Sequence, residues 1–427
     1  MPILRNHPAG LQVLFFTEMW ERFGFYIMMA IFTLYMDQDF LWDDARKGNV
    51  YGLFLGAVFF MPIIGGWIAD TWLGHRNTIR VGAVIMTVGY VMLALSSVNR
   101  LALFYLALVL VAVGTGLFKA NVSVLVGNLY EPGSQFKDAG YNIFYMGINL
   151  GAFLAPLAAT LVHSLFNSYN ISFGLAAVGM VLSMVIFEAG RQKYLYADTV
   201  HTSPRKAETT AEEAEASRRE ERQRLLSLGT LFAIVIFFWM AFYQNGFALT
   251  LFAQRSTVIY SYLQPETYQS FGAFFILLLT PFVVWIFGRL REKGKEPPNP
   301  VKIFVGMFTA GLSLIIMVGA SLLGGDRDVN IMSPYWLISS YFVITIAEIL
   351  VSPMGLSFVS KVAPARLRGL MMGCWFGATA IGSYSSGLLG RFYSDLEHHT
   401  YFLLLSILLL ATSFLVLASL RILKRFA

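Results

Sequence analysis

Twelve long runs of apolar residues follow one another along the chain, and short polar stretches separate most of them. An α-helix needs about 20 residues to cross the hydrocarbon core of a bilayer, and each run has roughly this length or more. The pattern therefore predicts twelve transmembrane helices. Their approximate ranges are 11–36, 48–70, 79–97, 101–126, 140–164, 171–190, 226–253, 267–289, 300–323, 334–358, 368–391 and 400–421.

One polar stretch is much longer than the others and divides the predicted helices into two groups of six. The expected organisation is an N-terminal bundle (1–190), a linker (191–225) and a C-terminal bundle (226–427). The linker contains AEEAEASRREERQR, in which opposite charges lie three and four residues apart, and this predicts a surface helix. Two linked six-helix halves are typical of a rocker-type transporter whose substrate site lies between the halves.

The composition agrees with a polytopic membrane protein. Of the 427 residues, 57% are hydrophobic and 13% are charged, compared with about 25% charged residues in soluble domains. The net charge of +6 does not indicate nucleic-acid binding, because the basic residues lie in short loops and not on one patch. Most Lys and Arg residues fall on the side of the two termini. We therefore expect a bacterial inner (plasma) membrane protein with both termini in the cytoplasm.

Cofactor chemistry is not expected. The single cysteine, Cys374, lies in an apolar run, and the six histidines fall in predicted loops or helix ends, so that neither a disulfide nor a metal site is indicated. No nucleophile and base stand out as a pair, which argues against an enzyme. The first apolar run is too long for the core of a signal peptide, so we expect it to remain as a helix.

The first predicted helix carries three charges, Glu18, Glu21 and Arg22, near its middle. At helical spacing they share one face with Phe25 and Tyr26. A charge at the bilayer centre costs about 2.5 to 3.5 kcal/mol on insertion scales, and such residues usually mark a transport path or a proton relay. A cluster that is internally neutralised and purely structural is the alternative.

Two more charges lie inside predicted helices: Lys119 in the fourth and Glu348 in the tenth. The predicted helices then contain three acids (Glu18, Glu21 and Glu348) and two basic residues (Arg22 and Lys119). One carboxylate must therefore be protonated, solvated or paired with a cation from outside. If the helices converge on one cavity, the arrangement suits a substrate with a negative end near Arg22 and Lys119. Its positive end would lie near Glu348.

The turn after the second predicted helix has the sequence GGWIADTWLGHRNTI, from Gly65 to Ile79. Asp70 and Arg76 in this turn can form a charged latch that breaks when the halves rock. The stretch resembles the motif GGxxADxxLGxR of the major facilitator superfamily. A static ion pair at the membrane edge is the alternative interpretation.

Three further motifs narrow the resemblance to one family. They are an ExxER pattern in the first helix (18–22), FYMGINLGA in the fifth (144–152) and APARLRGLMMGCWF before and within the eleventh (363–376). Together they closely resemble the proton-dependent oligopeptide transporter (POT/PTR) family. The resemblance implies a major facilitator fold and the symport of di- and tripeptides with protons. The linker is too short for the extra helix pair that is common in bacterial members.

The resemblance also implies roles for individual residues. Protons would be the coupling ion, the substrate would be a small peptide or a peptide-like zwitterion, and the protein would act as a monomer in membrane lipid. Asn149, for which a hydrogen bond to a neighbouring helix is an equally good interpretation, would help to hold the substrate. The implied substrate residues are Arg22, Tyr26, Lys119, Tyr145, Asn149, Gln244, Glu348 and Trp375, and the proton would exchange on Glu18 and Glu21, salt-bridged in turn to Arg22 and Lys119.

Several positions depart from the family pattern. Tyr243 replaces an acid that usually precedes the glutamine at 244, and Gly272 replaces an asparagine. Two tyrosine hydroxyls are also missing, at Phe25 and Phe59, and alanine stands at 120 in the usual KPN triplet. These losses favour two alternatives: the same fold could carry a more apolar or organic-anion cargo with altered proton coupling, or the protein could bind peptide without transport. The intact motif around Asp70 and Arg76 argues against a mere receptor.

Overall fold

The computed structural model describes residues 7–131, 134, 136–198, 211–364 and 367–419. Within these ranges the regular structure is helical apart from two isolated β-bridges. The same ranges contain twelve helices of 21 or more residues, as the apolar pattern predicts. They are α1 (Ala9–Gln38), α2 (Asp44–Ile68), α3 (Gly74–Ala94), α4 (Leu101–Asn128), α5 (Lys137–Phe166), α6 (Tyr169–Ala189), α7 (Ala211–Phe242), α9 (Gln269–Glu292), α10 (Asn299–Leu323), α11 (Pro334–Val362), α12 (Arg368–Gly390) and α13 (His398–Ala418).

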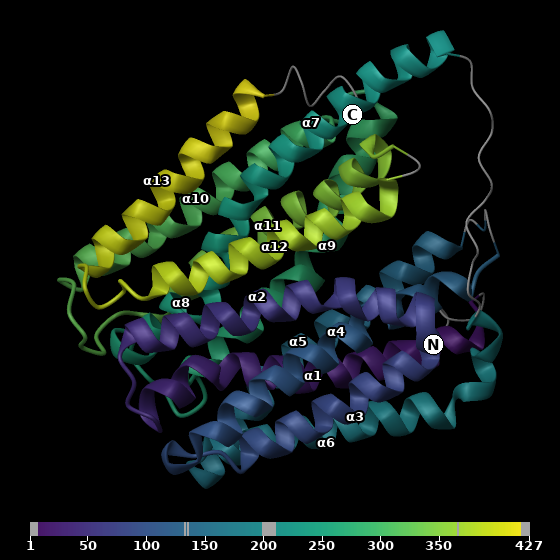
Figure 1. Ribbon diagram of the computed structural model, residues 1–427. Coiled ribbons are helices and arrows are strands. Elements are labelled where there is room, and N and C mark those ends of the chain that lie inside the picture. The colour runs from purple at the N-terminus through teal and green to yellow at the C-terminus, as the bar shows by residue number, and fades with distance from the viewer. Residues whose placement is uncertain (1–6, 132–133, 135, 199–210, 365–366, 420–427) are drawn as a thin grey trace.

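The helices form two groups (Figure 1). Helices α1 to α6 make the first half, and α7 to α13 make the second half. Nine segments of the described chain are long and apolar enough to span a membrane, and one of them, Asp44–Ala94, covers both α2 and α3. Helix α1 is not among them, because its charged residues lower its hydropathy. It is nevertheless buried along most of its length.

The linker is more helical than its boundaries predict. Helix α7 begins at Ala211, so the helix expected within the linker is continuous with the first membrane helix of the second half. Between α6 and α7 the described residues form two short 3₁₀ turns, Arg191–Lys193 and Leu195–Ala197. Residues 199–210 of the predicted linker lie outside the described part of the chain.

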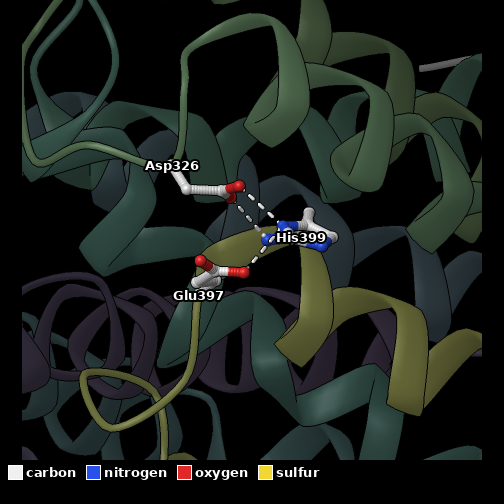
Figure 2. A group of neighbouring side chains, drawn as sticks. All are labelled: Asp326, Glu397 and His399. Carbon is white, nitrogen blue, oxygen red and sulfur yellow. Dashed lines mark hydrogen bonds and ion pairs between the residues drawn. The ribbon is translucent and has the colours of Figure 1, made fainter.

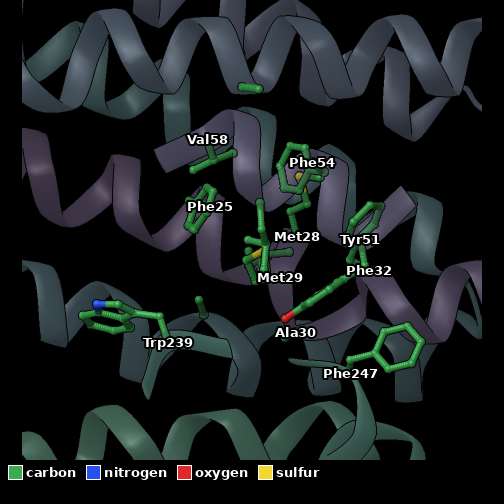
Figure 3. Close-up of a cluster of buried hydrophobic side chains, with 14 of the residues drawn as sticks. Phe25, Met28, Met29, Ala30, Phe32, Tyr51, Phe54, Val58, Trp239 and Phe247 are labelled. Atoms are coloured by element: carbon green, nitrogen blue, oxygen red, sulfur yellow. The ribbon is translucent and has the colours of Figure 1, made fainter. Parts of the chain in front are cut away.

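An apolar cluster joins the two halves near the middle of α1 (Figure 3). Phe25, Met28, Met29 and Phe32 of α1 pack with Tyr51, Phe54 and Val58 of α2, and Trp239 and Phe247 approach them from the second half. All of these side chains are buried. Because α1 lies between its own half and the other half, its charged face is held at the centre of the molecule.

The halves touch at one end of the molecule. We call this the far end; it holds Gln38, where α1 stops, and Asp44, where α2 starts. The other end, which holds the start of α1 and the end of α13, is the terminal end. At the far end the backbones of α2 and α12 are in direct contact: a Cβ atom on Gly387 would lie 2.2 Å from the carbonyl oxygen of Gly48 and 2.4 Å from the Cα atom of Gly52. Only glycine permits this approach.

Candidate functional site

The charged face of α1 is an ion-pair cluster that is almost fully buried. The guanidinium of Arg22 donates to both carboxylate oxygens of Glu21, with Nη2 2.5 Å from Oε1. Its Nε also lies 3.4 Å from Oε1 of Glu18. The exposed fractions of the three side chains are 3% or less. Among the described residues, the other oxygen of Glu18, Oε2, has no hydrogen-bond partner, so this cluster keeps an unused acceptor.

Lys119 is close to this cluster but is paired differently from the implied arrangement. Among the described residues, no carboxylate oxygen lies within 4 Å of its ammonium group, which instead lies 5.1 Å from the ring centre of Phe59. Phe59 packs against Tyr243 at 5.2 Å, and Tyr243 stacks on Trp239 at 5.6 Å. Tyr243, which stands where the family usually has an acid, therefore supports an aromatic surface beside Lys119. The face of an aromatic ring attracts a cation.

A cavity of about 1140 Å³ lies between the two halves. Helices α4 and α5 line it from the first half, and α9, α10 and α11 line it from the second. Its wall includes Tyr141 near the start of α5, Arg291 near the end of α9 and Lys361 near the end of α11. These helix ends lie at the terminal end, so the cavity extends from the interior to that end. The far end of the molecule is closed.

Two of the predicted substrate residues, Tyr145 and Glu348, line this cavity. The side chain of Tyr145 is 44% exposed, and Glu348 is half-buried. Within the described part of the chain no cation lies within 4 Å of the Glu348 carboxylate. Asn149 is buried one turn after Tyr145, and its amide donates to the Tyr145 carbonyl at 2.9 Å, within α5 and not to a neighbouring helix.

The second acid of the cavity wall, Glu296, is already neutralised by two basic residues. Arg291 Nε and Lys302 Nζ each donate to its carboxylate at 2.6 Å. These hydrogen bonds, from Arg291 and then Lys302, lower the pKa of Glu296 to about 2. Glu296 is therefore ionised at all physiological pH values. Glu348 is the cavity acid that has no ion pair to a described residue.

The other predicted substrate residues are packed away from the described cavity wall. Trp375 is 2% exposed and lies against Gly355, where a Cβ atom would be 2.0 Å from its ring. Gln244 is fully buried; its amide donates to the Ser386 carbonyl and accepts from the Tyr401 hydroxyl, both at 2.9 Å. Tyr26 is half-buried, with its ring 5.6 Å from that of Phe25.

The two predicted gate residues do not pair with each other in this conformation. Asp70 is 66% exposed and lies 3.7 Å from Nε2 of His75. Arg76 Nη2 instead lies 3.7 Å from the Glu188 carboxylate at the end of α6. The turn between them contains a π-helical segment over 69–73, followed by Gly74 at φ +72°.

A buried charge network at the far end was not predicted from the sequence. Lys47 contacts both Asp37 and Asp44, and its Nζ lies 2.6 Å from Asp44 Oδ1. Arg255 of the second half lies 2.7 Å from Asp37 and 3.2 Å from Asp44. Asp43 caps α2 by accepting from the Arg46 amide at 2.7 Å, and this fixes the start of the helix. The network joins the two halves. The feature of the sequence that could have indicated it is the small number of basic residues on the side of the membrane opposite the termini.

A second group at the far end lies entirely within the second half (Figure 2). Asp326 Oδ2 lies 2.6 Å from Nδ1 of His399, and its Oδ1 accepts from the His399 amide at 2.8 Å. Glu397 Oε2 lies 3.7 Å from the same Nδ1. These contacts attach the loop before α11 to the first turn of α13.

Comparison with known proteins places the chain in a family. The sequence model of the POT family matches residues 76–206 and 194–404, which is more than half of the chain. The chain belongs to the POT family. Peptide transporter YePEPT of Yersinia enterocolitica is 30% identical over 453 residues, covering 90% of this chain and 88% of that protein.

Solved POT structures share the fold. A point mutant of a peptide transporter POT in complex with alafosfalin is 31% identical, with a TM-score of 0.88 and coverage of 99% of this chain and 96% of that one. A POT family transporter in complex with a thioalcohol-conjugated peptide is 26% identical, with a TM-score of 0.86 and coverage of 98% and 97%. The predicted major facilitator fold is thus confirmed, and the chain is a multi-pass membrane protein of a transporter family.

Proposed function

We propose that this POT protein imports di- and tripeptides or peptide-like zwitterions with protons, by alternating access. The observation that carries the proposal is the cavity between the halves, which is open at the terminal end, closed at the far end and lined by Glu348, an acid with no ion pair to a described residue. The names and ligands of the related transporters support a peptide or peptide-like substrate.

The orientation follows from charge. Most Lys and Arg residues lie on the side of the termini, so we place the terminal end in the cytoplasm of a bacterial inner membrane. The structure then corresponds to an inward-facing state, in which substrate leaves toward the cytoplasm. One chain encloses the whole cavity, and we therefore propose that a monomer in membrane lipid is the working unit.

The charges of the site match a zwitterion. The carboxylate of Glu348 is available to the substrate amine, because no described cation occupies it. Lys119 is not among the described residues of the cavity wall, but its ammonium has no described carboxylate partner and is free to attract the substrate carboxylate. Arg22 is less accessible, since Glu21 and Glu18 hold it.

The α1 cluster offers a physical route to proton coupling. Protonating one carboxylate beside Arg22 weakens its hold on the guanidinium, which can then attract a substrate carboxylate. Proton binding and peptide binding favour each other in such an arrangement, and this linkage is reciprocal. We therefore propose Glu18 and Glu21 as the exchanging carboxylates.

Uptake into proteoliposomes tests the proposed function. Labelled di-alanine should accumulate when the outside is acidic and the interior negative, and it should only equilibrate when a protonophore is added. Liposomes that contain no protein measure leakage. Binding of di-alanine without gradient-driven accumulation would contradict symport.

Glu348→Gln should weaken the transport of free-amine peptides more than that of N-acetylated ones. The neutral amide keeps the shape but loses the charge that pairs with an amine, and a charge-assisted hydrogen bond is worth about 1.5 to 3 kcal/mol. We expect the KM for di-alanine to rise about 10-fold and that for acetyl-di-alanine to change less than about 3-fold. An equal loss for both substrates would exclude the amine-pairing role.

Gly387→Val should trap the protein with its far end open. The added side chain would occupy the space of the Gly48 carbonyl and the Gly52 backbone, so the halves could not meet there. We expect uptake to fall more than about 10-fold while membrane insertion and detergent-solubilised yield stay normal. Gly377→Val on the same helix is the control, because no atom lies within 4 Å of a Cβ placed there. Equal uptake by both variants would show that the glycine contact is not needed.

One set of observations favours a different cargo. Phe59 and Tyr243 pack together beside Lys119, and Phe25 lies over Arg22, so aromatic surface replaces polar groups near both cations. A more apolar or organic-anion substrate with altered proton coupling would fit this surface. Uptake of a labelled amphipathic anion that is inhibited by other amphipathic anions and not by di-alanine would favour this alternative.

A further inference from the structure

The cavity between the halves is longer than a small peptide. Glu348 lies in its inner part, and Lys361, on the same helix α11, lies at its mouth at the terminal end. An α-helix rises about 1.5 Å per residue, so the two positions are about 20 Å apart along α11. An extended tripeptide spans at most about 11 Å. A peptide bound at Glu348 therefore leaves the mouth of the cavity unoccupied.

The mouth carries an excess of positive charge. Arg291, Lys302 and Lys361 line it together with one acid, Glu296. Glu296 is shared by Arg291 and Lys302, whereas Lys361 is exposed and has no ion pair to a described residue. Arg291 is 74% exposed, and its Nη1 takes no part in its described contacts with Glu296. One carboxylate cannot neutralise three cations, so the mouth can attract an anionic group.

Local structure holds these charges at the mouth. Gly294, at φ +65°, follows the end of α9 and lets the chain reverse, so that Glu296 reaches back to Arg291. The side chain of Lys302 is 5% exposed, and its Nζ lies 4.2 Å from the ring centre of Phe287. The ion pairs and this ring contact fix the basic groups relative to α9 and α10.

Aromatic and basic residues place the mouth at the level of the lipid headgroups. Trp285 of α9 is 59% exposed, and the guanidinium of Arg289 lies 5.1 Å from its ring centre. The described cavity wall contains neither residue, so both lie on the outer surface of α9. Tryptophan is enriched where membrane helices meet the headgroups, and basic side chains near helix ends extend to the same level. Arg291 follows immediately after this pair.

An apolar slot lies between α5 and α9 on the membrane side of the mouth. The two helices meet toward the far end, where the ring centres of Phe153 and Phe274 are 5.9 Å apart. Toward the terminal end the cavity separates them. Apolar side chains from both helices line this part of the cavity: Phe144, Ile148, Val283 and Val284. Val284 is 64% exposed and adjoins Trp285, so the slot continues into the lipid-facing surface of α9.

We propose that the mouth and the slot bind one anionic phospholipid of the inner leaflet. Its phosphate would contact Arg291 and Lys361, and one acyl chain would lie between α5 and α9. Basic pockets between membrane helices on the cytoplasmic side suit anionic headgroups. A lipid without net charge gains less from the positive mouth. A free anion reaches the same charges but gains no apolar contact from the slot.

A lipid at this position favours the inward-facing state. Closing the terminal end brings α5 and α9 together, and the acyl chain has to leave the slot first. A ligand that binds one state and not the other stabilises the state that it binds. This consequence, like the assignment to the inner leaflet, rests on the proposed function. The lipid site itself does not.

Native mass spectrometry of the purified protein in detergent tests the site without substrate or gradient. The probes are dioleoyl-phosphatidylglycerol, dioleoyl-phosphatidylcholine with the same chains, and glycerol 3-phosphate as a headgroup without chains. Arg291→Gln combined with Lys361→Gln removes the two exposed charges of the mouth. Arg191→Gln combined with Lys193→Gln is the matched control, because it removes two exposed charges after α6, away from the described cavity wall. Val284→Trp fills the slot and keeps every charge.

The parent should bind phosphatidylglycerol at least about 10-fold more tightly than phosphatidylcholine. The double variant at Arg291 and Lys361 should lose at least about 10-fold in affinity for phosphatidylglycerol, and the control double variant less than about 3-fold. Val284→Trp should weaken phosphatidylglycerol binding at least about 3-fold and leave glycerol 3-phosphate binding unchanged.

Two results would overturn the proposal. The first is equal affinity of the parent for the two lipids, or equal affinity of the parent and the variant at Arg291 and Lys361 for phosphatidylglycerol. The second is glycerol 3-phosphate binding as tightly as phosphatidylglycerol, which would show a site for free anions. Failure of di-alanine uptake would leave the lipid site standing, because binding is measured without transport.

Discussion

Replacing Lys119 with alanine is expected to abolish gradient-driven uptake while leaving peptide counterflow measurable. The Lys119 ammonium lies beside the Glu18, Glu21 and Arg22 cluster but has no described carboxylate partner. Its electrostatic energy therefore depends on the charge of the cluster, and it can attract a substrate carboxylate. Without it, protonation of the cluster releases Arg22 alone, and the second cation that would attract the substrate carboxylate is missing. Driven uptake should fall at least about 30-fold, on the scale of one charge-assisted contact of about 2 kcal/mol.

The measurement is paired uptake and counterflow of labelled di-alanine in one batch of proteoliposomes. Lys193→Ala is the control, because this exposed lysine lies in the short turn after α6, away from the cavity. Driven uptake that is unchanged in Lys119→Ala would refute the coupling role. A parallel loss of counterflow would show that the lysine acts in binding alone.

Replacing Arg255 with methionine is expected to shift the protein toward an open far end. Arg255 of the second half pairs with Asp37 and Asp44 of the first half, whereas Lys47 lies in the same half as both acids, so the Arg255 pairs are the ones that are lost on opening. A hydrogen bond to a charged group is worth about 1.5 to 3 kcal/mol. The closed-to-open ratio should therefore fall by at least about 10-fold.

Spin-label distances across the far end provide the measurement, and Lys47→Met provides the control. Lys47 pairs with Asp37 and Asp44 within the first half, so its removal takes a cation from the network in both states and should not favour opening. A closed population in Arg255→Met equal to that of the parent would show that the network does not hold the far end shut.

The helices and their charged positions could be predicted because both are local properties of the sequence. A run of about 20 apolar residues reports a membrane helix directly, and a charge within such a run is conspicuous. The prediction placed Glu18, Glu21 and Arg22 on one face of α1, and the structure brings them together. The cavity contacts of Tyr145 and Glu348 likewise follow from helices that face one centre.

Partners that lie far apart in the chain could not be predicted in the same way. Asp37 meets Arg255, and His163 meets Glu266, only because the far end is closed in this conformation. Periodicity contains no information on such a state. For the same reason the side chains of Arg76 and Lys119, expected to bind Asp70 and a carboxylate, have other neighbours here. The departure at Tyr243 was visible in the sequence, but its stacking with Phe59 was not.

Because α7 continues into the linker, this helix extends beyond the membrane at the terminal end and moves together with the second half. Residues 211–219 of α7 precede the segment Glu220–Arg255, which is long and apolar enough to span the membrane. These residues extend the helix by about 14 Å beyond that segment at the terminal end. Any tilt of the second half is magnified at the tip of this helix. A fluorescent dye near the start of α7 should report each transport cycle as an optical signal, without any label inside the membrane.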